Sequence, residues 1–383
     1  MFQERVAIGL SWLSSQRLAM QRLLERLTRQ SSFTADPLGV NAVVSILDAE
    51  LVRIGFKVTR IPASRFGDHL YFETTAKDDP VFLIGHTDTV FPRRSFDGFE
   101  VQGDFARGPG VFYMKGGLVV AVFALEALAR AALLRHIAVR GMFVSDEEVG
   151  SPDSQLHLRA RAAGSSCALG FESGRAGDAI VTQRKGVASV QVEASGVGAH
   201  AGNEHAKGRN AIWALARFVD RVQSLTDYAR GVTVNVGLFH GGTTKNTVPD
   251  QAHAEVDLRY TTEEEGEAAY AAIEAAAREA PLEGTRIRLV KTAWRPPMSR
   301  TEASAALAQQ YGRCQAECAL GSGEAPLSGG GSDASTTSAI GIPTIDGLGP
   351  RGAGFHTTEE RVDLASLVPK ATALARFLGQ RAV

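Results

Sequence analysis

The chain has 383 residues, of which 44% are hydrophobic and 22% are charged, and its formal net charge is −1. This length exceeds what one ordinary hydrophobic core organises, so the sequence predicts a globular protein of two domains. The balanced charge argues against a nucleic-acid or membrane-surface partner and leaves small molecules as the expected ligand class.

Cysteine usage and hydropathy bear on the compartment. Cys167, Cys314 and Cys318 form no CxxC pair and no even framework, which favours a reducing environment. The first twenty residues include charged side chains and no long apolar run, so they are not a secretory signal. The most apolar segment, Leu118–Leu134, contains an acidic and a basic residue and is typical of a buried helix. We therefore expect a cytoplasmic protein without a membrane partner.

The first part of the chain alternates helical and strand-like patterns. Residues 1–30 place apolar side chains at helical spacing and predict one amphipathic helix, and a second helix is expected over Leu38–Ile54, before Gly55. A long helix is expected from about Gly116. Apolar runs predict strands at Lys57–Ile61, His69–Glu73, Val81–Ile84 and Ala138–Val144. Because helices interleave with strands that are apolar on both faces, we expect an α/β domain with a mixed sheet that contains parallel strands.

The pattern changes after Lys185-Gly186, where polar and apolar residues begin to alternate. Strands are expected over Val187–Ala194, Val232–Phe239 and Ala252–Tyr260, and helices over Gly208–Leu225 and Thr262–Ala280. Alternation of this kind is typical of an antiparallel sheet with one exposed face. After Trp294 the chain returns to helices and glycine-rich loops. We predict an α+β domain, residues 186–294, inserted into an α/β domain formed by residues 1–185 and 295–383.

The first candidate for chemistry follows the strand expected at Val81–Ile84. His86 and Asp88 are two residues apart, so they lie on the same side of an extended chain. Histidine is a common zinc ligand, and a nearby carboxylate fixes the tautomer of a ligating imidazole. A loop histidine beside a capping aspartate would have the same sequence, so both interpretations stay open on these residues alone.

The other candidates also follow apolar runs or lie in glycine-rich loops. Glu147 and Glu148 are adjacent, so one carboxylate can bind a metal while the other moves protons, although a solvated acidic turn is the commoner cause of such a pair. Glu172 lies among small residues and, taken alone, is best interpreted as a surface charge. His356 is presented by a glycine-rich loop, which suits a ligand that the backbone approaches closely but is also typical of an ordinary loop.

The order of these sequence motifs along the chain is more informative than any one of them. His-x-Asp is followed by Gly-x-Gly-x-x-x-Met-Lys-Gly-Gly, then Glu-Glu, then Glu, then His. This series resembles the zinc aminoacylase/carboxypeptidase family, and most of all its glutamate carboxypeptidase (carboxypeptidase G) type. The resemblance covers nearly the whole chain. It implies a zinc-exopeptidase-like catalytic domain with a mixed sheet, and an inserted lid and dimerisation domain with an antiparallel sheet.

The resemblance also implies roles for individual residues of the catalytic domain. His86 and Glu172 would hold one metal ion, and Glu148 and His356 would hold the other. Asp88 would orient His86. Glu147 would be the general base that deprotonates the attacking water. The implied cofactor is Zn²⁺.

Three residues of the inserted domain, and Arg295 directly after it, receive roles in the same way. His200 would reach the site of the partner subunit in a homodimer and stabilise the tetrahedral oxyanion. Asn246, Arg259 and Arg295 would bind the substrate and its carboxylate, for which a bidentate arginine is well suited. For Arg259, a charge on the exposed face of a strand is an equally good interpretation.

Tyr113 departs from the family pattern. The family has an aspartate at this position, and that carboxylate bridges the two metal ions, whereas this chain reads Phe112-Tyr113-Met114-Lys115. A phenol has one oxygen, is larger than a carboxylate and has a reference pKa of about 10, so it is neutral unless a metal ionises it. Tyr113 could ligate a single zinc as phenolate, fill one metal position and leave a mononuclear site, or mark a protein without catalytic metal. We expect one or two zinc ions and favour one.

Two functional hypotheses follow. The first is a metal-dependent hydrolase that cleaves the amide bond of an N-acyl amino acid or short peptide with a free carboxylate. The second is a catalytically lapsed or repurposed protein. It would bind a carboxylated ligand through Arg295 and Asn246, or catalyse a non-hydrolytic reaction such as amide formation or rearrangement.

Overall fold

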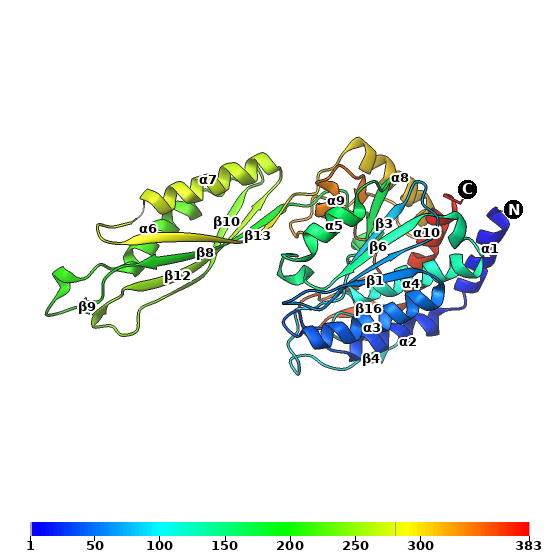
Figure 1. The fold of residues 1–383 in the computed structure, drawn as a ribbon, viewed down its shortest axis with the longest axis horizontal. Coiled ribbons are helices and arrows are strands. Elements are labelled where there is room, and N and C mark those ends of the chain that lie inside the picture. Colours follow the sequence, from blue (N-terminus) through cyan, green and yellow to red (C-terminus); the bar gives the residue numbers. More distant parts are fainter. Residues whose placement is uncertain (1, 280, 383) are drawn as a thin grey trace. The chain divides into compact units, whose positions relative to one another are not determined.

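The computed structural model describes residues 2–279 and 281–382, and the chain divides into two compact units (Figure 1). The main unit comprises the residues up to Gln183, Arg300–Ser328, and the residues from Ser332. The inserted unit comprises Arg184–Ser299 and Gly329–Gly331. An α/β unit is thus interrupted by a second domain, as the sequence predicts.

The chain begins with two helices instead of the one predicted over residues 1–30. Helix α1 spans Phe2–Leu13 and helix α2 spans Arg17–Arg29. The hydroxyls of Ser14 and Ser15 donate to backbone carbonyls of the preceding turn, and this local bonding competes with continuation of the helix. The expectation of a single helix is therefore wrong, because apolar periodicity alone does not reveal such a break.

Helix α3 follows its sequence signals closely. It spans Pro37–Ile54, and the Asp36 side chain accepts a hydrogen bond from the backbone N–H of Gly39 at its start. Gly55 ends it in the left-handed conformation, with φ of 107°, where a glycine has no steric cost. The predicted helix over Leu38–Ile54 is confirmed.

The main sheet has the strand order β1-β2-β6-β3-β7-β14. Strand β3 pairs in parallel with both β6 and β7, while β1–β2 and β2–β6 are antiparallel, so the predicted mixed sheet is confirmed. The strands are β1 Lys57–Ile61, β2 His69–Glu73, β3 Val81–His86, β6 Val139–Val144, β7 Cys167–Gly170 and β14 Thr344–Ile345. Parallel neighbours place their carboxyl ends at one edge of the sheet, and this edge carries the candidate site.

Helices cover both faces of this sheet (Figure 1). Helix α4, Lys115–Arg130, is almost entirely buried and packs on β3, α1, α2 and the last helix, α10, Leu367–Gly379. The opposite face packs on α5, Ser154–Ala162. The remaining helices of the unit are α8 Glu302–Ala316 and α9 Ala334–Ser338. None of the described helices combines the length and apolar character needed to cross a membrane.

A small sheet in the main unit was not predicted from the sequence. Its strand order is β15-β16-β5-β4, and each strand has only two or three residues, too few for a visible pattern. The strands are β4 Glu100–Gln102, β5 Phe105–Arg107, β15 Gly352–Ala353 and β16 Arg361–Asp363. This sheet brings the C-terminal glycine-rich loop next to the segment that leads to Tyr113.

The inserted unit is an antiparallel sheet with the order β10-β12-β8-β13. Its strands are β8 Gly186–Ser195, β10 Thr233–Gly241, β12 Gln251–Tyr260 and β13 Arg286–Arg295, and a separate short ladder joins β9 Ala199–His200 to β11 Thr247–Val248. Helices α6, Ala211–Gln223, and α7, Glu263–Glu279, pack on one face. The predicted end of the second helix at Ala280 lies outside the described residues. Strand β13 was not predicted.

Candidate metal centre

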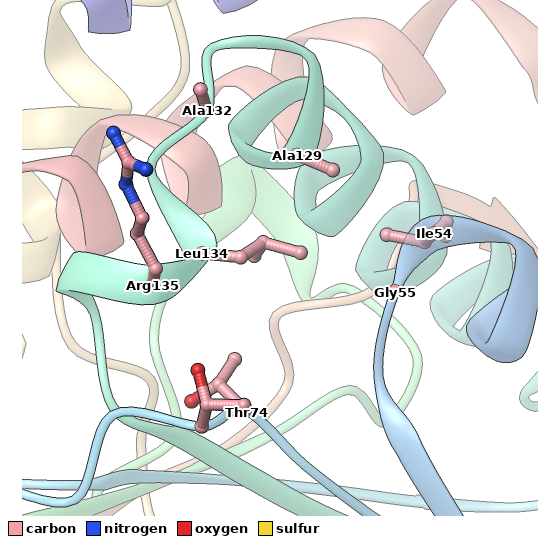
Figure 2. Close-up of a pocket in the computed structure, with 8 residues that line it drawn as sticks. Ile54, Gly55, Thr74, Ala129, Ala132, Leu134 and Arg135 are labelled. Carbon is pink, nitrogen blue, oxygen red and sulfur yellow. The ribbon is translucent and has the colours of Figure 1, made fainter.

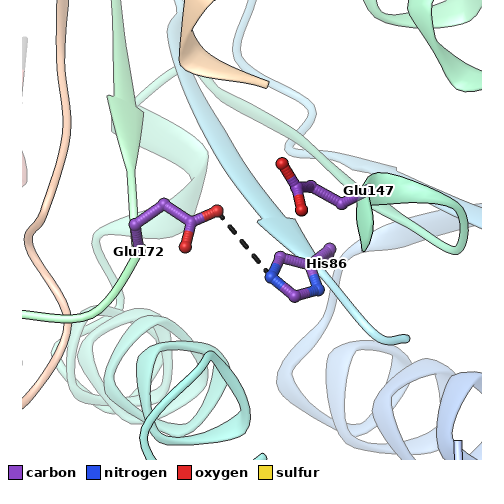
Figure 3. Close-up of side chains that lie close together, drawn as sticks. All are labelled: His86, Glu147 and Glu172. Carbon is purple, nitrogen blue, oxygen red and sulfur yellow. Dashed lines mark ion pairs between the residues drawn. The ribbon is translucent and has the colours of Figure 1, made fainter. Parts of the chain in front are cut away.

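The candidate residues of the main unit gather at the carboxyl edge of the sheet. His86 is the last residue of β3, while the acidic turn and Glu172 follow the neighbouring strands β6 and β7. Figure 3 shows the side chains of His86, Glu147 and Glu172 directed toward a common point. One ligand atom of each lies within 4.8 Å of the others, and all three residues are buried. These residues are 25 to 86 positions apart in sequence, and parallel pairing brings them together.

The first pair of candidate ligands is His86 and Glu172. Their atoms Nε2 and Oε1 are 3.7 Å apart, and the Nδ1 of His86 lies 3.0 Å from the backbone oxygen of Asp88. A carbonyl oxygen can only accept, so Nδ1 carries a proton, and in the neutral ring Nε2 presents its lone pair toward Glu172. Burial opposes the charged ring, yet the hydrogen bond to Asp88 and the charges of Glu172, Asp88 and Glu147 raise the pKa of His86 well above its ordinary value.

Asp88 joins the histidine to the acidic turn. Its carboxylate is buried, lies 3.3 Å from the His86 ring and accepts the Thr34 hydroxyl at 2.8 Å. It also accepts the backbone N–H groups of Glu147 and Glu148 at 3.3 and 3.2 Å. Burial alone would raise the pKa of Asp88, but the bond to His86, the His86 charge and the bond from Thr34 lower it. Asp88 therefore positions the base candidate as well as the histidine.

The second pair of candidate ligands is Glu148 and His356. Oε2 of Glu148 lies 3.2 Å from Nε2 of His356. The hydrogen bond to Glu148 raises the pKa of His356, while burial raises the pKa of Glu148. His356 has a φ of 62°, in the left-handed region that the glycine-rich loop makes reachable. The two pairs that the family resemblance implies are thus both present as neighbours in the structure.

Tyr113 lies beside the histidines of both pairs. Its ring centroid is 5.5 Å from that of His86 and 5.0 Å from that of His356. It also stacks on Phe355, with centroids 5.5 Å apart and an interplanar angle of 27°. The peptide bond between Tyr113 and Met114 is cis. An aromatic ring therefore occupies the region between the two pairs.

A buried carboxylate that the sequence did not single out holds the Tyr113 segment. Glu360 accepts the backbone N–H groups of Gly110, Phe112 and Tyr113 at 3.1, 2.9 and 2.9 Å. It lies four residues after His356, so one side chain connects the histidine loop to the tyrosine segment. A glutamate in a loop carries no signal of such a role, because the bonds are to backbone atoms about 250 residues away.

Truncating the side chain of Glu360 should destabilise the folded protein. Glu360→Ala leaves buried N–H groups without their acceptor, and we expect the free energy of unfolding to fall by about 3 kcal/mol. Urea denaturation measures this, with Glu359→Ala as the control because Glu359 is the exposed neighbour. Equal stability of the two variants would contradict the role given to Glu360.

The glycine-rich loop has a second anchor. Arg351 donates to the buried carboxylate of Asp178, and Lys370 lies 3.3 Å from it. Burial alone would raise the pKa of Asp178, but the hydrogen bonds from Arg351 and the charge of Lys370 lower it. Because the folded state favours the charged form, this stabilisation is present above the ordinary aspartate pKa of about 4 and is lost as the pH falls through the lowered value.

The pH dependence of unfolding tests this anchor. We expect Asp178→Asn to lower the free energy of unfolding at pH 7 and to flatten its dependence on pH below about 4. Urea denaturation at a series of pH values measures both effects. Parallel pH profiles for the variant and the wild type would show that the lowered pKa of Asp178 contributes nothing to acid sensitivity.

The residues at this edge suit a divalent cation such as zinc. Nε2 of His86 and Oε1 of Glu148 are buried and make no hydrogen bond among the described residues. Buried polar atoms normally have partners, so these atoms are candidates for metal ligation. Imidazole nitrogen and carboxylate oxygen are donors that zinc prefers. The donor set therefore fits the implied metal.

Comparisons with known proteins show which chains this one resembles. Residues 182–285 match a family model described as a peptidase dimerisation domain. The chain is 28% identical over 383 aligned residues to carboxypeptidase G2 from Pseudomonas sp. (strain RS-16), covering 98% of this chain and 92% of that protein.

Solved structures extend the comparison to the fold. An aminopeptidase from Bacillus cereus has a TM-score of 0.76 at 21% identity, covering 96% of this chain and 99% of its own. An M20 family metallo-carboxypeptidase from Sulfolobus solfataricus has a TM-score of 0.77 at 17% identity, with the same coverage. The chain has the M20 peptidase fold. Its structural neighbours include M20 metallopeptidases, and its inserted unit matches the peptidase dimerisation domain.

In this M20 dimerisation domain, His200 and Asn246 lie close together and are exposed. Strands β9 and β11 pair here, and the backbone oxygen of Asn246 accepts the N–H of Ala201 at 2.8 Å. Nδ1 of His200 accepts the backbone N–H groups of Gly202 and Asn203 at 3.2 and 3.1 Å. The imidazole therefore presents a protonated Nε2 when it is neutral.

The two predicted substrate arginines of the M20 dimerisation domain differ in their surroundings. Both are paired with Val187 in the sheet register, on β12 and β13, so they lie on the same face. Arg259 makes a bidentate pair with Asp257, at 2.7 and 2.8 Å. Arg295 is buried at the end of β13 and lies close to Gly331. The guanidinium of Arg259 is therefore already paired with a carboxylate of the same chain.

A hollow elsewhere in the main unit offers little chemistry. It has a volume of about 290 Å³ and is lined by residues that include Ile54, Thr74, Leu134 and Arg135 (Figure 2). Arg135 is its ionisable lining side chain, and none of the predicted site residues lines it. The carboxyl edge of the sheet is therefore the better candidate for the functional site of this M20 fold.

Proposed function

We propose that this protein is a metal-dependent hydrolase that cleaves the amide bond of an N-acyl amino acid or short peptide with a free carboxylate. The convergence of His86, Glu147 and Glu172 at the carboxyl edge of the sheet carries this proposal. The second pair, Glu148 and His356, lies beside them. The likeness to carboxypeptidase G2 supports a reaction of the glutamate carboxypeptidase type.

The proposed metal is a single zinc ion. His86 and Glu172 would hold it, because this pair is buried and Asp88 fixes the histidine with Nε2 directed outward. When bound, zinc polarises a substrate carbonyl and lowers the pKa of water. Tyr113 lies beside the histidines of both pairs, and a neutral phenol supplies neither one oxygen for each of two cations nor a negative charge to offset their repulsion. We therefore propose a mononuclear site.

Glu147 is proposed as the general base. Its carboxylate belongs to the same 4.8 Å group as the two ligands, so it stands within reach of a water molecule held beside them. The hydrogen bond from its backbone N–H to Asp88 fixes its position relative to His86. Glu147 would take the proton from the attacking water and deliver it to the leaving nitrogen.

Residues of the dimerisation domain are proposed to bind the substrate. His200 presents a protonated Nε2, which suits a donor to the tetrahedral oxyanion in the partner subunit's site. Arg295 and Asn246 are proposed to bind the substrate carboxylate. Arg259, which also pairs with Asp257, is proposed as a second arginine for this group.

A hydrolysis assay tests the proposed function. N-acyl amino acids with different acyl groups and side chains are incubated with protein that has been stripped by chelator and then reloaded with zinc. We expect release of the free amino acid from at least one substrate class, loss after stripping, and recovery after reloading. Failure to hydrolyse any member, combined with binding of a carboxylated ligand, would instead support a repurposed protein.

A homodimer through the inserted unit is part of the proposal. Trp213 on α6 and Leu238 and Phe239 on β10 are large apolar side chains that are exposed. Strand β10 is an edge of its sheet, so its backbone can pair with a second copy. The match to a peptidase dimerisation domain supports this assignment. We also propose a cytoplasmic location, from the cysteine usage.

A single charge on the edge strand should weaken the dimer. We expect Phe239→Glu to raise the dimer dissociation constant at least about tenfold, because it places a charge in an apolar contact. Sedimentation velocity over a range of concentrations measures the change. Phe105→Glu is the matched control, since Phe105 is 45% exposed in the main unit and Phe239 is 40% exposed. Equal dimer dissociation constants for Phe239→Glu and Phe105→Glu would show that β10 is not part of the interface.

A further inference from the structure

A buried histidine outside the candidate ligands contacts the acidic turn from behind. His69 is the first residue of β2 and has no exposed surface. Its Nδ1 accepts the backbone N–H of Ser145 at 3.1 Å, and its Nε2 lies 2.9 Å from Oδ1 of Asp153. Each ring nitrogen therefore has a partner of a different kind.

These partners fix the protonation of the ring. A backbone N–H can only donate, so Nδ1 of His69 must present a lone pair to Ser145. The proton of the neutral imidazole is then on Nε2, where the Asp153 carboxylate accepts it. A proton on Nδ1 would face the N–H of Ser145 and break this contact. The geometry thus requires one tautomer of His69.

Ser145 begins the turn that carries Glu147 and Glu148. Its hydroxyl donates to the backbone oxygen of Asp68 at 2.6 Å. The next residue, Asp146, accepts the backbone N–H of Asp153 at 2.8 Å. Asp153 therefore holds the turn through its backbone and His69 through its carboxylate. Asp88 holds the other end of the turn, at the N–H groups described above.

We propose that His69, kept as the Nε2–H tautomer by Asp153, is a positioning residue for Glu147 and Glu148. This inference rests on the proposed function, because it takes Glu147 as the general base beside the zinc ion that His86 and Glu172 would hold. His69 acts through the Ser145 backbone and touches neither substrate nor metal. Loss of a group that acts in this indirect way typically lowers metal affinity or activity about 10- to 100-fold. We expect an effect of about this size here.

Two substitutions test whether His69 acts through its hydrogen bonds or only through its volume. His69→Phe keeps a planar ring but removes both hydrogen bonds, whereas the side-chain oxygen of His69→Asn can still accept the Ser145 N–H. His157→Phe is the control, because His157 is a half-buried histidine 4.0 Å from the same Asp153 oxygen. Zinc affinity by chelator competition, kcat, KM and the melting temperature are measured for each folded variant.

We expect His69→Phe to lower kcat by about 10- to 100-fold, with smaller changes in KM and in zinc affinity, because it displaces Glu147 while His86 and Glu172 still hold the metal. His69→Asn should recover most of this loss, and His157→Phe should resemble the wild type. A kcat of His69→Phe within about twofold of the wild type would overturn the proposal, as would equal losses in the Asn and Phe variants.

A measurement on the wild type keeps the inference testable if His69→Phe does not fold. Nitrogen-15 NMR of the imidazole rings, assigned with the His69→Asn spectrum, should show Nδ1 of His69 unprotonated and Nε2 protonated at pH 7.5. The opposite tautomer or a doubly protonated ring would overturn the proposal. Absence of zinc binding by the wild type would overturn the proposed function itself, and a zinc-binding wild type with an insensitive His69 would overturn this inference alone.

Discussion

Replacing Tyr113 with aspartate should raise the zinc content from about one to about two ions per chain. The ring of Tyr113 lies 5.5 and 5.0 Å from the rings of His86 and His356, so a smaller side chain with two oxygens would face both pairs of ligands. Its negative charge would offset the repulsion between two cations held close together. Metal analysis after saturation with zinc and removal of the excess measures this change.

An uncharged variant of the same size separates charge from space. Tyr113→Asn opens the same volume as Tyr113→Asp but supplies no carboxylate, so we expect it to bind about one zinc ion. A second zinc ion in both variants would show that the volume of the tyrosine, and not the missing charge, limits the site. No second ion in Tyr113→Asp would show that the two pairs do not form a dinuclear site even with a carboxylate between them.

Glu147→Gln should lower kcat by about a thousandfold while the protein still binds zinc. The amide keeps the shape of the side chain and the backbone bond to Asp88, but it cannot take a proton from water. Stopped assays at saturating substrate, together with metal analysis of the same samples, measure both quantities. The pH profile of the residual activity should also lose the limb that reports ionisation of the base.

The neighbouring glutamate is the natural control for this prediction. Glu148 pairs with His356, and its own amide variant should disturb the second pair without removing the base. A fall of kcat in Glu147→Gln of less than about tenfold would show that another group moves the proton. Loss of zinc from Glu147→Gln would instead make Glu147 a ligand, which its place beside His86 and Glu172 also permits.

The large elements of the fold were predictable because their patterns are long. Strands β1, β2, β3 and β6 of the main sheet and helix α3 agree with their apolar runs and end signals, whereas the short strands β7 and β14 were not predicted. The break between α1 and α2 depends on two serine hydroxyls within an otherwise helical pattern. Strand β13 was missed because its exposed positions and basic residues hide the alternation, and the two- and three-residue strands have no period to detect.

The candidate site was predictable to the extent that its residues belong to recognisable sequence motifs. His86, Glu147, Glu172 and His356 were identified this way, and the structure brings them to one edge of the sheet. Glu360 and His69 were not, because their roles depend on backbone atoms that are distant in sequence. Only the pairing of strands and loops reveals that a side chain points at such an atom. Nothing in the local sequence distinguishes them from a loop glutamate and a strand histidine.

Zinc analysis of the wild-type protein, purified without chelator and then dialysed against trace zinc, tests the proposed metal centre most directly. Inductively coupled plasma mass spectrometry should find about one zinc ion per chain. His86→Ala should abolish this binding, because it removes the buried nitrogen that faces Glu172. A wild-type protein that retains no zinc under these conditions would contradict the proposed hydrolase.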